Sequence, residues 1–376
     1  MTVHGLDSYG SLMATAELSN TETIDAITVE AFNEQLLGHF TSSFVTHMVD
    51  IGHRTGLFDA LGQGPTTSAE LARRAGLHER YVREWLGAIV TSGIANYEST
   101  TEVYSLPPEH RVSLSGDTAH NVAAFSQLSG LLARHIPAVT RAFREGGGVP
   151  YSDYRPEFTD VMDALGRATY DALLVDTIVP LAGDLDERLA QGIRVADIGC
   201  GTGHTTNLLA SAYPRSTFIG YDIATDAIDN ARREAAECEL TNVTFEIHDV
   251  ARLPTTPSFG AVFAFDAIHD QTDPARVLQQ VHDSLDPDGT FAMFDIRASS
   301  HLECNLDNPL APMLYAISTL HCTPISLADN GAGLGTVWGQ ELAKRMLRQA
   351  GFVDVNVYDV PNDPFDCLYV SHRGQD

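Results

Sequence analysis

The sequence predicts an α/β protein with a mostly parallel sheet, preceded by a mostly helical domain. From residue 193 onward, short apolar segments alternate with helical patterns, as in parallel sheets covered by helices. Residues 66–106 have the order helix, turn, helix and hairpin, which is typical of a winged helix. At 376 residues, the chain is long enough for both domains.

The composition is strongly acidic. Fifty Asp and Glu residues stand against 23 Lys and Arg residues, for a formal net charge of −27, and Lys344 is the one lysine in the sequence. Such a surface repels polyanions, so we expect neither nucleic acid nor an anionic membrane as a partner. A salt-loving host would explain both the acidity and the scarcity of lysine, whereas a GC-rich genome would explain the preference for arginine.

The sequence predicts a cytoplasmic location. The first 20 residues lack a basic stretch followed by an apolar one, so they do not resemble a signal peptide. No run of about 18 apolar residues indicates a membrane span. The cysteines are odd in number and form no C-x-x-C pair, which favours reduced thiols and predicts no metal site. They are Cys200, Cys238, Cys304, Cys322 and Cys367.

The region before the sheet is expected to mediate dimerisation. Residues 1–25 are polar and aperiodic, as in a flexible arm. Apolar residues at helical spacing predict two helices between Ile24 and Leu61. Their apolar stripes exceed what so small a domain can bury, so we expect a homodimer built on them and on the winged helix. Within that motif, Ser68 is expected to cap the first helix.

A glycine-containing break suggests the domain boundary. Helical patterns end at Arg144, and Glu145-Gly146-Gly147-Gly148-Val149-Pro150 is the best hinge candidate. We therefore assign residues 26–150 to the winged-helix and dimerisation domain with its helical extension, and residues 151–376 to the α/β domain.

A glycine-rich turn follows the first predicted strand, residues 193–198. The sequence Asp197-Ile198-Gly199-Cys200-Gly201-Thr202-Gly203-His204 has the pattern D-x-G-x-G-x-G. Glycines let the backbone approach a ligand, and the next helix presents free N–H groups to a carboxylate or phosphate. A dinucleotide fingerprint would need glycine in place of His204, so a NAD site is not predicted.

Acidic residues stand at the ends of the following predicted strands, which cover residues 217–221, 243–247, 261–265, 290–296 and 354–358. Asp222 ends the second strand, where a carboxylate can accept both hydroxyls of a ribose. Asp249 follows the third strand, where a side chain can meet an adenine amine. The fourth strand leads into Asp266 and, three residues later, His269.

Together these segments resemble the class I S-adenosylmethionine-dependent methyltransferase family over about residues 175–370. VADIGCGTG resembles its first motif, GYD its acidic ribose motif and LDPDGTFAMFD its strand-five motif. The resemblance implies a Rossmann-like domain with a mostly parallel seven-stranded sheet and S-adenosylmethionine as the cofactor. It implies a cofactor site formed by Asp197, Gly199, Cys200, Gly201, Gly203, Asp222, Ile223, Asp249, Val250 and Asp266.

His269 is the candidate catalytic base. The segment AIHDQTDPARVLQQVHDSLDPDGT resembles the H-D-W-S-D segment of small-molecule O-methyltransferases, whose histidine is the base; His269 and Asp270 match it, and Gln271 replaces the tryptophan. An unperturbed pKa near 6.5 suits a general base, and Asp270 could orient the ring. In the alternative interpretation, His269 packs or caps a loop. The winged helix strengthens the comparison, because these O-methyltransferases dimerise through one.

Residues 297–335 form a long insertion after the fifth strand, where insertions cover the acceptor pocket. It holds the candidate acceptor-site residues Tyr315, His321 and Cys322, each of which could instead be a packing residue. With Cys304, Cys322 could bind a soft acceptor such as a metalloid. A mycobacterial and other microbial set of methyltransferases is similar in layout and in the segments DIRASSHLE and LGTVWG.

The sequence therefore predicts methyl transfer to a small-molecule oxygen. A thiol acceptor is the alternative within enzymes, because a thiol needs a base much less. A cofactor-binding transcription regulator is the alternative outside enzymes. Its expected recognition helix, residues 78–92, carries Arg80 and Arg83 against Glu79 and Glu84, so it has no net positive charge.

Overall fold

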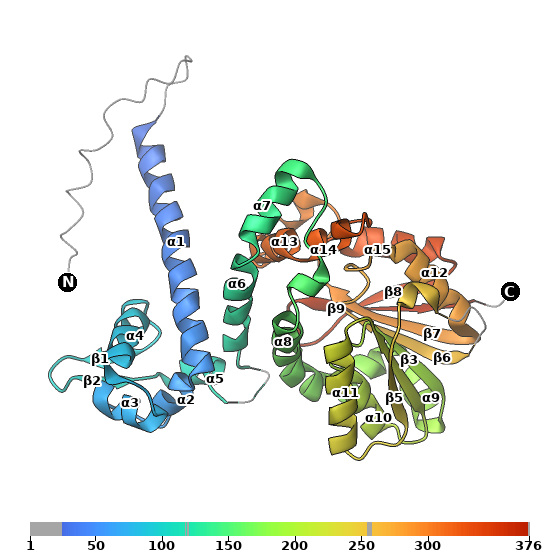
Figure 1. Ribbon diagram of the computed structural model, residues 1–376, viewed down its shortest axis with the longest axis horizontal. Coiled ribbons are helices and arrows are strands. Elements are labelled where there is room, and N and C mark those ends of the chain that lie inside the picture. The colour runs from blue at the N-terminus through green and yellow to red at the C-terminus, as the bar shows by residue number, and fades with distance from the viewer. Residues whose placement is uncertain (1–24, 117, 119, 254–257, 375–376) are drawn as a thin grey trace. The chain divides into compact units, whose positions relative to one another are not determined.

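The computed structural model describes residues 25–116, 118, 120–253 and 258–374 (Figure 1). The predicted flexible arm, residues 1–25, lies outside them except for Asp25. The chain divides into two compact units, Met1–Phe44 and Val45–Asp376. The described part of the first unit is the beginning of helix α1 (Ala26–Arg54), where Asp25 accepts a hydrogen bond from the Ile27 N–H.

The winged helix forms as the sequence predicts. Its elements are α2 (Leu57–Gly62), α3 (Ser68–Ala75), α4 (Glu79–Thr91) and the antiparallel strands β1 (Asn96–Glu98) and β2 (Val103–Ser105). Leu71, Leu86 and Ile89 are fully buried in its core. The predicted cap is wrong by one residue: the Thr67 side chain accepts from the Glu70 N–H, and Ser68 instead donates to Glu79.

Short helices connect the winged helix to the sheet. They are α5 (Pro108–Leu114), η1 (Ala123–Phe125), α6 (Ser126–Ala133), α7 (Ile136–Glu145), η2 (Tyr151–Asp153), α8 (Glu157–Leu173), η3 (Leu174–Ile178), η4 (Val179–Ala182) and α9 (Leu185–Gln191). The predicted break after Arg144 is present, since Gly146 and Gly147 have positive φ angles of 78° and 74°. The adjoining Val149 is held in place, because its N–H donates to the Pro324 carbonyl at 3.1 Å.

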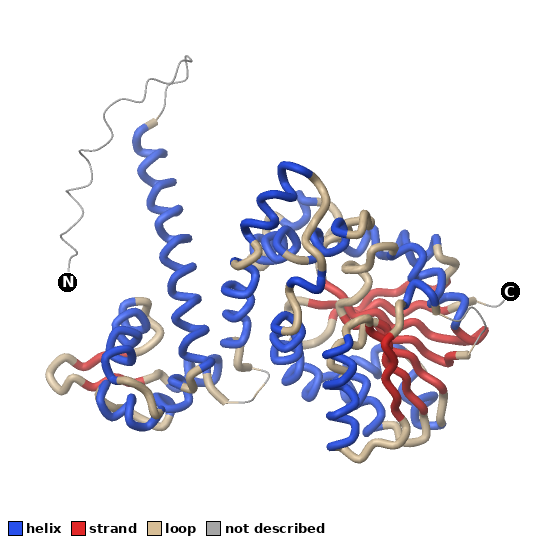
Figure 2. Tube along the Cα trace, in the orientation of Figure 1, coloured by secondary structure: helices blue, strands red, loops and turns tan. Residues whose placement is uncertain are grey.

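A seven-stranded sheet organises the C-terminal half, as Figure 2 shows. Its order is β5-β4-β3-β6-β7-β9-β8, with β9 antiparallel to both neighbours and the other pairs parallel. The strands are β3 (Arg194–Ile198), β4 (Thr217–Asp222), β5 (Val243–Ile247), β6 (Phe259–Phe265), β7 (Leu285–Ile296), β8 (Val353–Asp359) and β9 (Asp366–His372). Strand β9 completes the predicted seven but was not located from the sequence, and β7 begins five residues before the predicted strand at residues 290–296.

Helices cover both faces of this sheet. Along β3, Val195 packs with residues of α9 and α10 (His204–Ala212), whereas Ala196 packs with residues of α12 (Pro274–Ser284) and α15 (Gly339–Gln349). The alternation follows from the two-residue period of a strand. Helix α11 (Thr225–Glu237) packs against β4 and β5. The parallel strands β3–β7 therefore end at one edge, where the predicted motifs meet.

The insertion after β7 is folded. It forms η6 (Leu302–Asn305), α13 (Ala311–Leu320) and α14 (Cys322–Ala328), with α13 and α14 in contact. Its inner side is apolar and packs on α6 and α8, through Ile325, Leu128 and Phe158 among others. Among the helices that the structure describes, none combines the length and the apolar character that a membrane span requires.

Candidate active site

The glycine-rich turn after β3 adopts a backbone that suits glycine. Gly199, Gly201 and Gly203 have φ angles of 69°, 52° and 75°, which side-chain-bearing residues rarely adopt. A Cβ on Gly203 would collide with Ala231 and Phe245, whereas a Cβ on Gly201 would point into open space. The turn is therefore packed from below at Gly203 and open at Gly201, as a ligand cradle requires.

Asp222 lies beside this turn at the end of β4. Its carboxylate accepts from the Gly201 N–H at 2.9 Å and from the Ala224 N–H at 2.8 Å. Burial raises its pKa above the ordinary value, while these hydrogen bonds oppose that rise. The structure thus joins the two predicted motifs, and the carboxylate is positioned at the edge where a ribose would bind.

Asp197 and Cys200 lie beneath the turn. Asp197 accepts hydrogen bonds from the hydroxyls of Thr205 and Thr206, so it holds the first turn of α10. Its other carboxylate oxygen is buried without a hydrogen bond, and burial raises its pKa to about 6. Cys200 is buried against Gly220 and Phe245. Both residues support the turn from within the protein.

The predicted adenine side has one exposed and one buried flank. Ile223 is 59% exposed directly after Asp222. Asp249 caps η5 (Val250–Arg252) by accepting from the Ala251 N–H at 3.0 Å, and it pairs with Arg252. Val250 is buried in the sheet core. The exposed side chain of Ile223 could pack against one face of a purine, with the Asp249 carboxylate nearby in the sequence-predicted adenine site.

A charged network, which no sequence pattern indicates, holds the glycine-rich turn after β3 in place. His204 pairs with Glu234 at 2.8 Å and with Asp171 at 2.9 Å, and Arg167 pairs with Glu234 at 2.6 Å. Burial disfavours the charged forms, but these contacts outweigh it: the pKa of His204 is raised and that of Glu234 falls to about 2. The Thr202 hydroxyl in turn donates to Asp163 of α8.

At the other end of the edge, the loop after β6 carries His269. Its Nδ1 lies 2.9 Å from Asp295 Oδ1 at the end of β7, and the Trp338 indole N–H donates to the same oxygen at 3.1 Å. His269 is 4% exposed and Asp295 fully buried. The carboxylate hydrogen-bonded to the ring is therefore Asp295, which was not among the predicted site residues, whereas an orienting role for Asp270 stays a prediction. Asp270 lies on the Nε2 side, at 3.4 Å.

Carboxylates dominate the electrostatics around His269. Burial lowers its pKa, but Asp295 and Asp270 outweigh that effect and hold the pKa well above 6.5. Asp266, which has a left-handed φ of 49°, is half-buried here, and desolvation together with Asp295 raises its pKa to about 8. The prediction had placed Asp266 with the cofactor, whereas the structure gives it His269 and Asp295 as neighbours.

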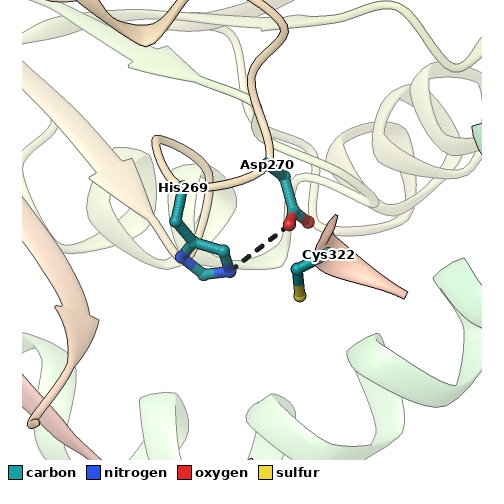
Figure 3. Close-up of side chains that lie close together, drawn as sticks. All are labelled: His269, Asp270 and Cys322. Atoms are coloured by element: carbon teal, nitrogen blue, oxygen red, sulfur yellow. Dashed lines mark ion pairs between the residues drawn. The ribbon is translucent and has the colours of Figure 1, made fainter. Parts of the chain in front are cut away.

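Two of the three insertion residues lie beside His269. Cys322 Sγ and polar atoms of His269 and Asp270 lie within 4.8 Å of one another (Figure 3). His321 is fully buried and stacks on Phe158 with centroids 3.7 Å apart, and burial lowers its pKa to about 4. Tyr315 lies elsewhere in the insertion, where its hydroxyl accepts from Asn305.

Tyr151 is a further residue of this region, and no sequence pattern points to it. Desolvation raises its pKa to about 12, and the negative charges of Asp222 and Asp270 add to the rise. Its ring meets the His321 ring edge-on, with centroids 6.2 Å apart. Tyr151 is therefore within electrostatic range of both carboxylates.

Two family models match the chain. Residues 43–116 match the Rv2258c-like winged HTH domain, and residues 189–351 match a methyltransferase domain. The trans-aconitate 2-methyltransferase of Methylobacterium nodulans is 36% identical over 30% of this chain and 42% of its own length. The aklanonic acid methyltransferase of Streptomyces sp. strain C5 is 32% identical over 38% of this chain and 66% of its own length.

Another relative is named for a different activity. The S-adenosyl-L-methionine-dependent Diels-Alderase of Talaromyces variabilis is 26% identical over 46% of this chain and 58% of its own length. Each of these three matches spans less than two thirds of the relative. They therefore identify the domain rather than a whole-protein activity.

Solved structures match over nearly the whole chain. The mitomycin 7-O-methyltransferase has a TM-score of 0.68 at 16% identity, covering 93% of this chain and all of the other. Human N-acetylserotonin methyltransferase, solved with S-adenosylmethionine, has a TM-score of 0.66 at 16% identity, covering 95% of this chain and all of the other. At this identity the match shows the fold, including the winged helix ahead of the sheet. The chain therefore carries a winged-helix domain at residues 43–116 and a methyltransferase domain at residues 189–351, in a fold shared with S-adenosylmethionine-dependent methyltransferases.

Proposed function

We propose that this protein transfers a methyl group from S-adenosylmethionine to a hydroxyl of a small molecule, with His269 as the general base. The observation that carries the proposal is the buried His269–Asp295 pair, 2.9 Å apart, at the carboxyl edge of the sheet. Asp295 accepts a hydrogen bond from the Nδ1–H, so that in the neutral ring Nε2 is the nitrogen that can receive a proton from an acceptor. Bound S-adenosylmethionine supplies an electrophilic methyl group on a sulfonium.

The protein's own residues orient the cofactor and the acceptor and exclude water from between them. The turn at Gly201 and the Asp222 carboxylate are suited to the amino acid and ribose parts of the cofactor, with Asp249, Val250 and Ile223 around the adenine. Tyr151, His321 and Phe158 form an aromatic cluster in which both other rings contact the His321 ring. Holding an acceptor in line beside the base supplies several kcal/mol of the barrier reduction.

A thiol acceptor is the second candidate within enzymes. The Cys322 thiol lies next to His269. A sulfur atom there interacts more favourably with a soft acceptor atom than oxygen ligands would. A thiol ionises near neutral pH and does not require His269. The two candidates therefore differ in their dependence on His269: methyl transfer to a hydroxyl requires it, and methyl transfer to a thiol does not.

A screen of small-molecule hydroxyls and thiols, scored by release of S-adenosylhomocysteine, tests the proposal. We expect release with a hydroxyl acceptor and a methylated product in equal amount by mass spectrometry. Product formed without S-adenosylhomocysteine would point to chemistry of the kind named for the Diels-Alderase relative. Release confined to thiols would favour the second candidate.

The charges on the winged helix favour a structural role for this domain over DNA binding. On α4, Arg80 pairs with Glu84 and Arg83 pairs with Glu79, so the arginines are already neutralised. A net charge of −27 further opposes approach to DNA. A gel-shift titration at low salt is expected to show no sequence-selective complex, and such a complex would instead support a transcription regulator.

We also propose a homodimer built on α1 and the winged-helix region. Leu37, Phe40, Phe44 and Ile51 form one stripe along α1 at helical spacing and are 62%, 58%, 72% and 44% exposed. A second copy carries the same stripe and can cover it by twofold symmetry. Light scattering in high salt should give the dimer mass, and Phe40→Asp together with Phe44→Asp should shift it to the monomer; a wild-type monomer would contradict the proposal.

A further inference from the structure

We propose that the acceptor side holds a second kind of site, for a soft divalent cation such as Zn²⁺, formed by His269 Nε2, the Asp270 carboxylate and Cys322 Sγ. Figure 3 shows the three side chains converging from the loop after β6 and from the start of α14. Their candidate ligand atoms all lie within 4.8 Å of one another. Nitrogen, oxygen and sulfur donors in one cluster are a typical zinc set.

The spacing and the orientation of His269 suit a metal. Ligands of tetrahedral zinc stand about 3.3–3.8 Å apart, given bond lengths of about 2.0–2.3 Å. His269 Nε2 and Asp270 Oδ1 are 3.4 Å apart. The opposite ring nitrogen is held by Asp295, which Trp338 orients in turn. A histidine ligand whose second nitrogen is bound to a carboxylate is the usual arrangement behind zinc.

The other two ligands also have atoms available. Asp270 Oδ1 is buried without a hydrogen-bond partner, although the side chain as a whole is 23% exposed and offers an entry path. The Thr336 hydroxyl donates to Cys322 Sγ at 2.9 Å, which fixes the position of the sulfur. The buried carboxylate of Asp295 on the other side of the ring adds negative potential. When the Zn–S bond forms, the thiol proton leaves to solvent.

The consequence for catalysis is inhibition, and this part rests on the proposed function. A metal at Nε2 occupies the atom that would accept the proton of the hydroxyl. The cofactor elements at Gly201 and Asp222 are not among the three ligands. Zn²⁺ is therefore expected to stop methyl transfer to a hydroxyl while leaving S-adenosylhomocysteine affinity unchanged.

A cobalt titration of the full-length protein, free of any histidine tag, tests the site without turnover. Co²⁺ should bind one to one with a thiolate-to-cobalt absorption band in the near ultraviolet, and Zn²⁺ should displace it. Cys322→Ser should lose the band, whereas Cys304→Ser, which changes an exposed cysteine of the same insertion, should keep it. Asp270→Asn should keep the band with affinity reduced about tenfold or more. Circular dichroism establishes that each variant is folded.

A wild-type protein that shows no thiolate band, or a band that survives in Cys322→Ser, would overturn the site. If Cys322→Ser does not fold, the loss of affinity in Asp270→Asn decides, and unchanged affinity there would overturn it. Turnover should fall at least tenfold at saturating Zn²⁺; unchanged turnover would overturn the inhibition. Failure of every acceptor to react would count against the proposed function and leave the cobalt result standing.

Discussion

The cofactor end and the acceptor end of the sheet edge are built differently. At the cofactor end, the main contacts are local: Gly201 and Asp222 come from adjacent strands, and backbone N–H groups meet one carboxylate. At the acceptor end, His269, Asp295 and Cys322 come from three separate segments and meet as buried side chains. Backbone geometry leaves a pattern in the sequence, whereas packed side chains from distant segments do not.

The largest expected effect is at the acceptor end. His269→Ala should lower turnover of a hydroxyl acceptor by roughly 10²- to 10⁴-fold, because the proton acceptor is lost. Affinity for S-adenosylhomocysteine, measured by calorimetry, should stay nearly unchanged. Asp295→Asn and Asp270→Asn should cause smaller losses. Wild-type turnover of a hydroxyl acceptor by His269→Ala would reduce His269 to a residue that shapes the pocket.

The converse change is expected at the cofactor end. Asp222→Ala should weaken S-adenosylmethionine binding by roughly 10- to 100-fold, because hydrogen bonds to a charged group contribute about 1.5–3 kcal/mol. Gly201→Val should also weaken it, since its φ of 52° and its open face both oppose a side chain. Calorimetry and a thermal melt of the same samples separate binding from folding. Wild-type affinity in Asp222→Ala would remove Asp222 from the site.

The smallest effect concerns the network that fastens the glycine turn. Glu234→Gln should lower the free energy of unfolding by about 1–2 kcal/mol at pH 7, because Glu234 pairs with both His204 and Arg167. The pKa of Glu234 is lowered to about 2, so its contribution is present above pH 4.5 and is lost as pH falls toward 2. Denaturant titrations against Glu237→Gln, an exposed glutamate on the same helix, provide the check. Equal stabilities would contradict this role.

The sequence was sufficient for most of the fold. Short apolar segments between helical patterns placed six of the seven strands, and the glycine pattern placed the turn after β3. Strand β9 was missed because it lies at the end of the chain, where no helix follows to mark it. The cap at Thr67 was missed because two neighbouring hydroxyl residues are equally good candidates.

The acceptor end could be predicted only in part. His269 was found because its segment resembles a known one, and His321 and Cys322 were found because the insertion follows β7. Asp295 belongs to the strand motif LDPDGTFAMFD, but its pairing with His269 was not predicted. His269 lies in the loop after β6, whereas Asp295 lies near the end of β7. Tyr151 was missed because a single aromatic residue creates no spacing pattern in the sequence. Its relation to Asp222 and Asp270 appears only in the folded chain.

The pH dependence of a single methyl-transfer turnover tests the central claim most directly. Only the neutral form of His269 can accept a proton, and Asp295 and Asp270 raise its pKa. With a hydroxyl acceptor, the wild-type rate should therefore rise with pH through an apparent pKa above 6.5, and this inflection should move down in Asp295→Asn and vanish in His269→Ala. A profile that follows the acceptor's own ionisation and is the same in all three proteins would contradict the account.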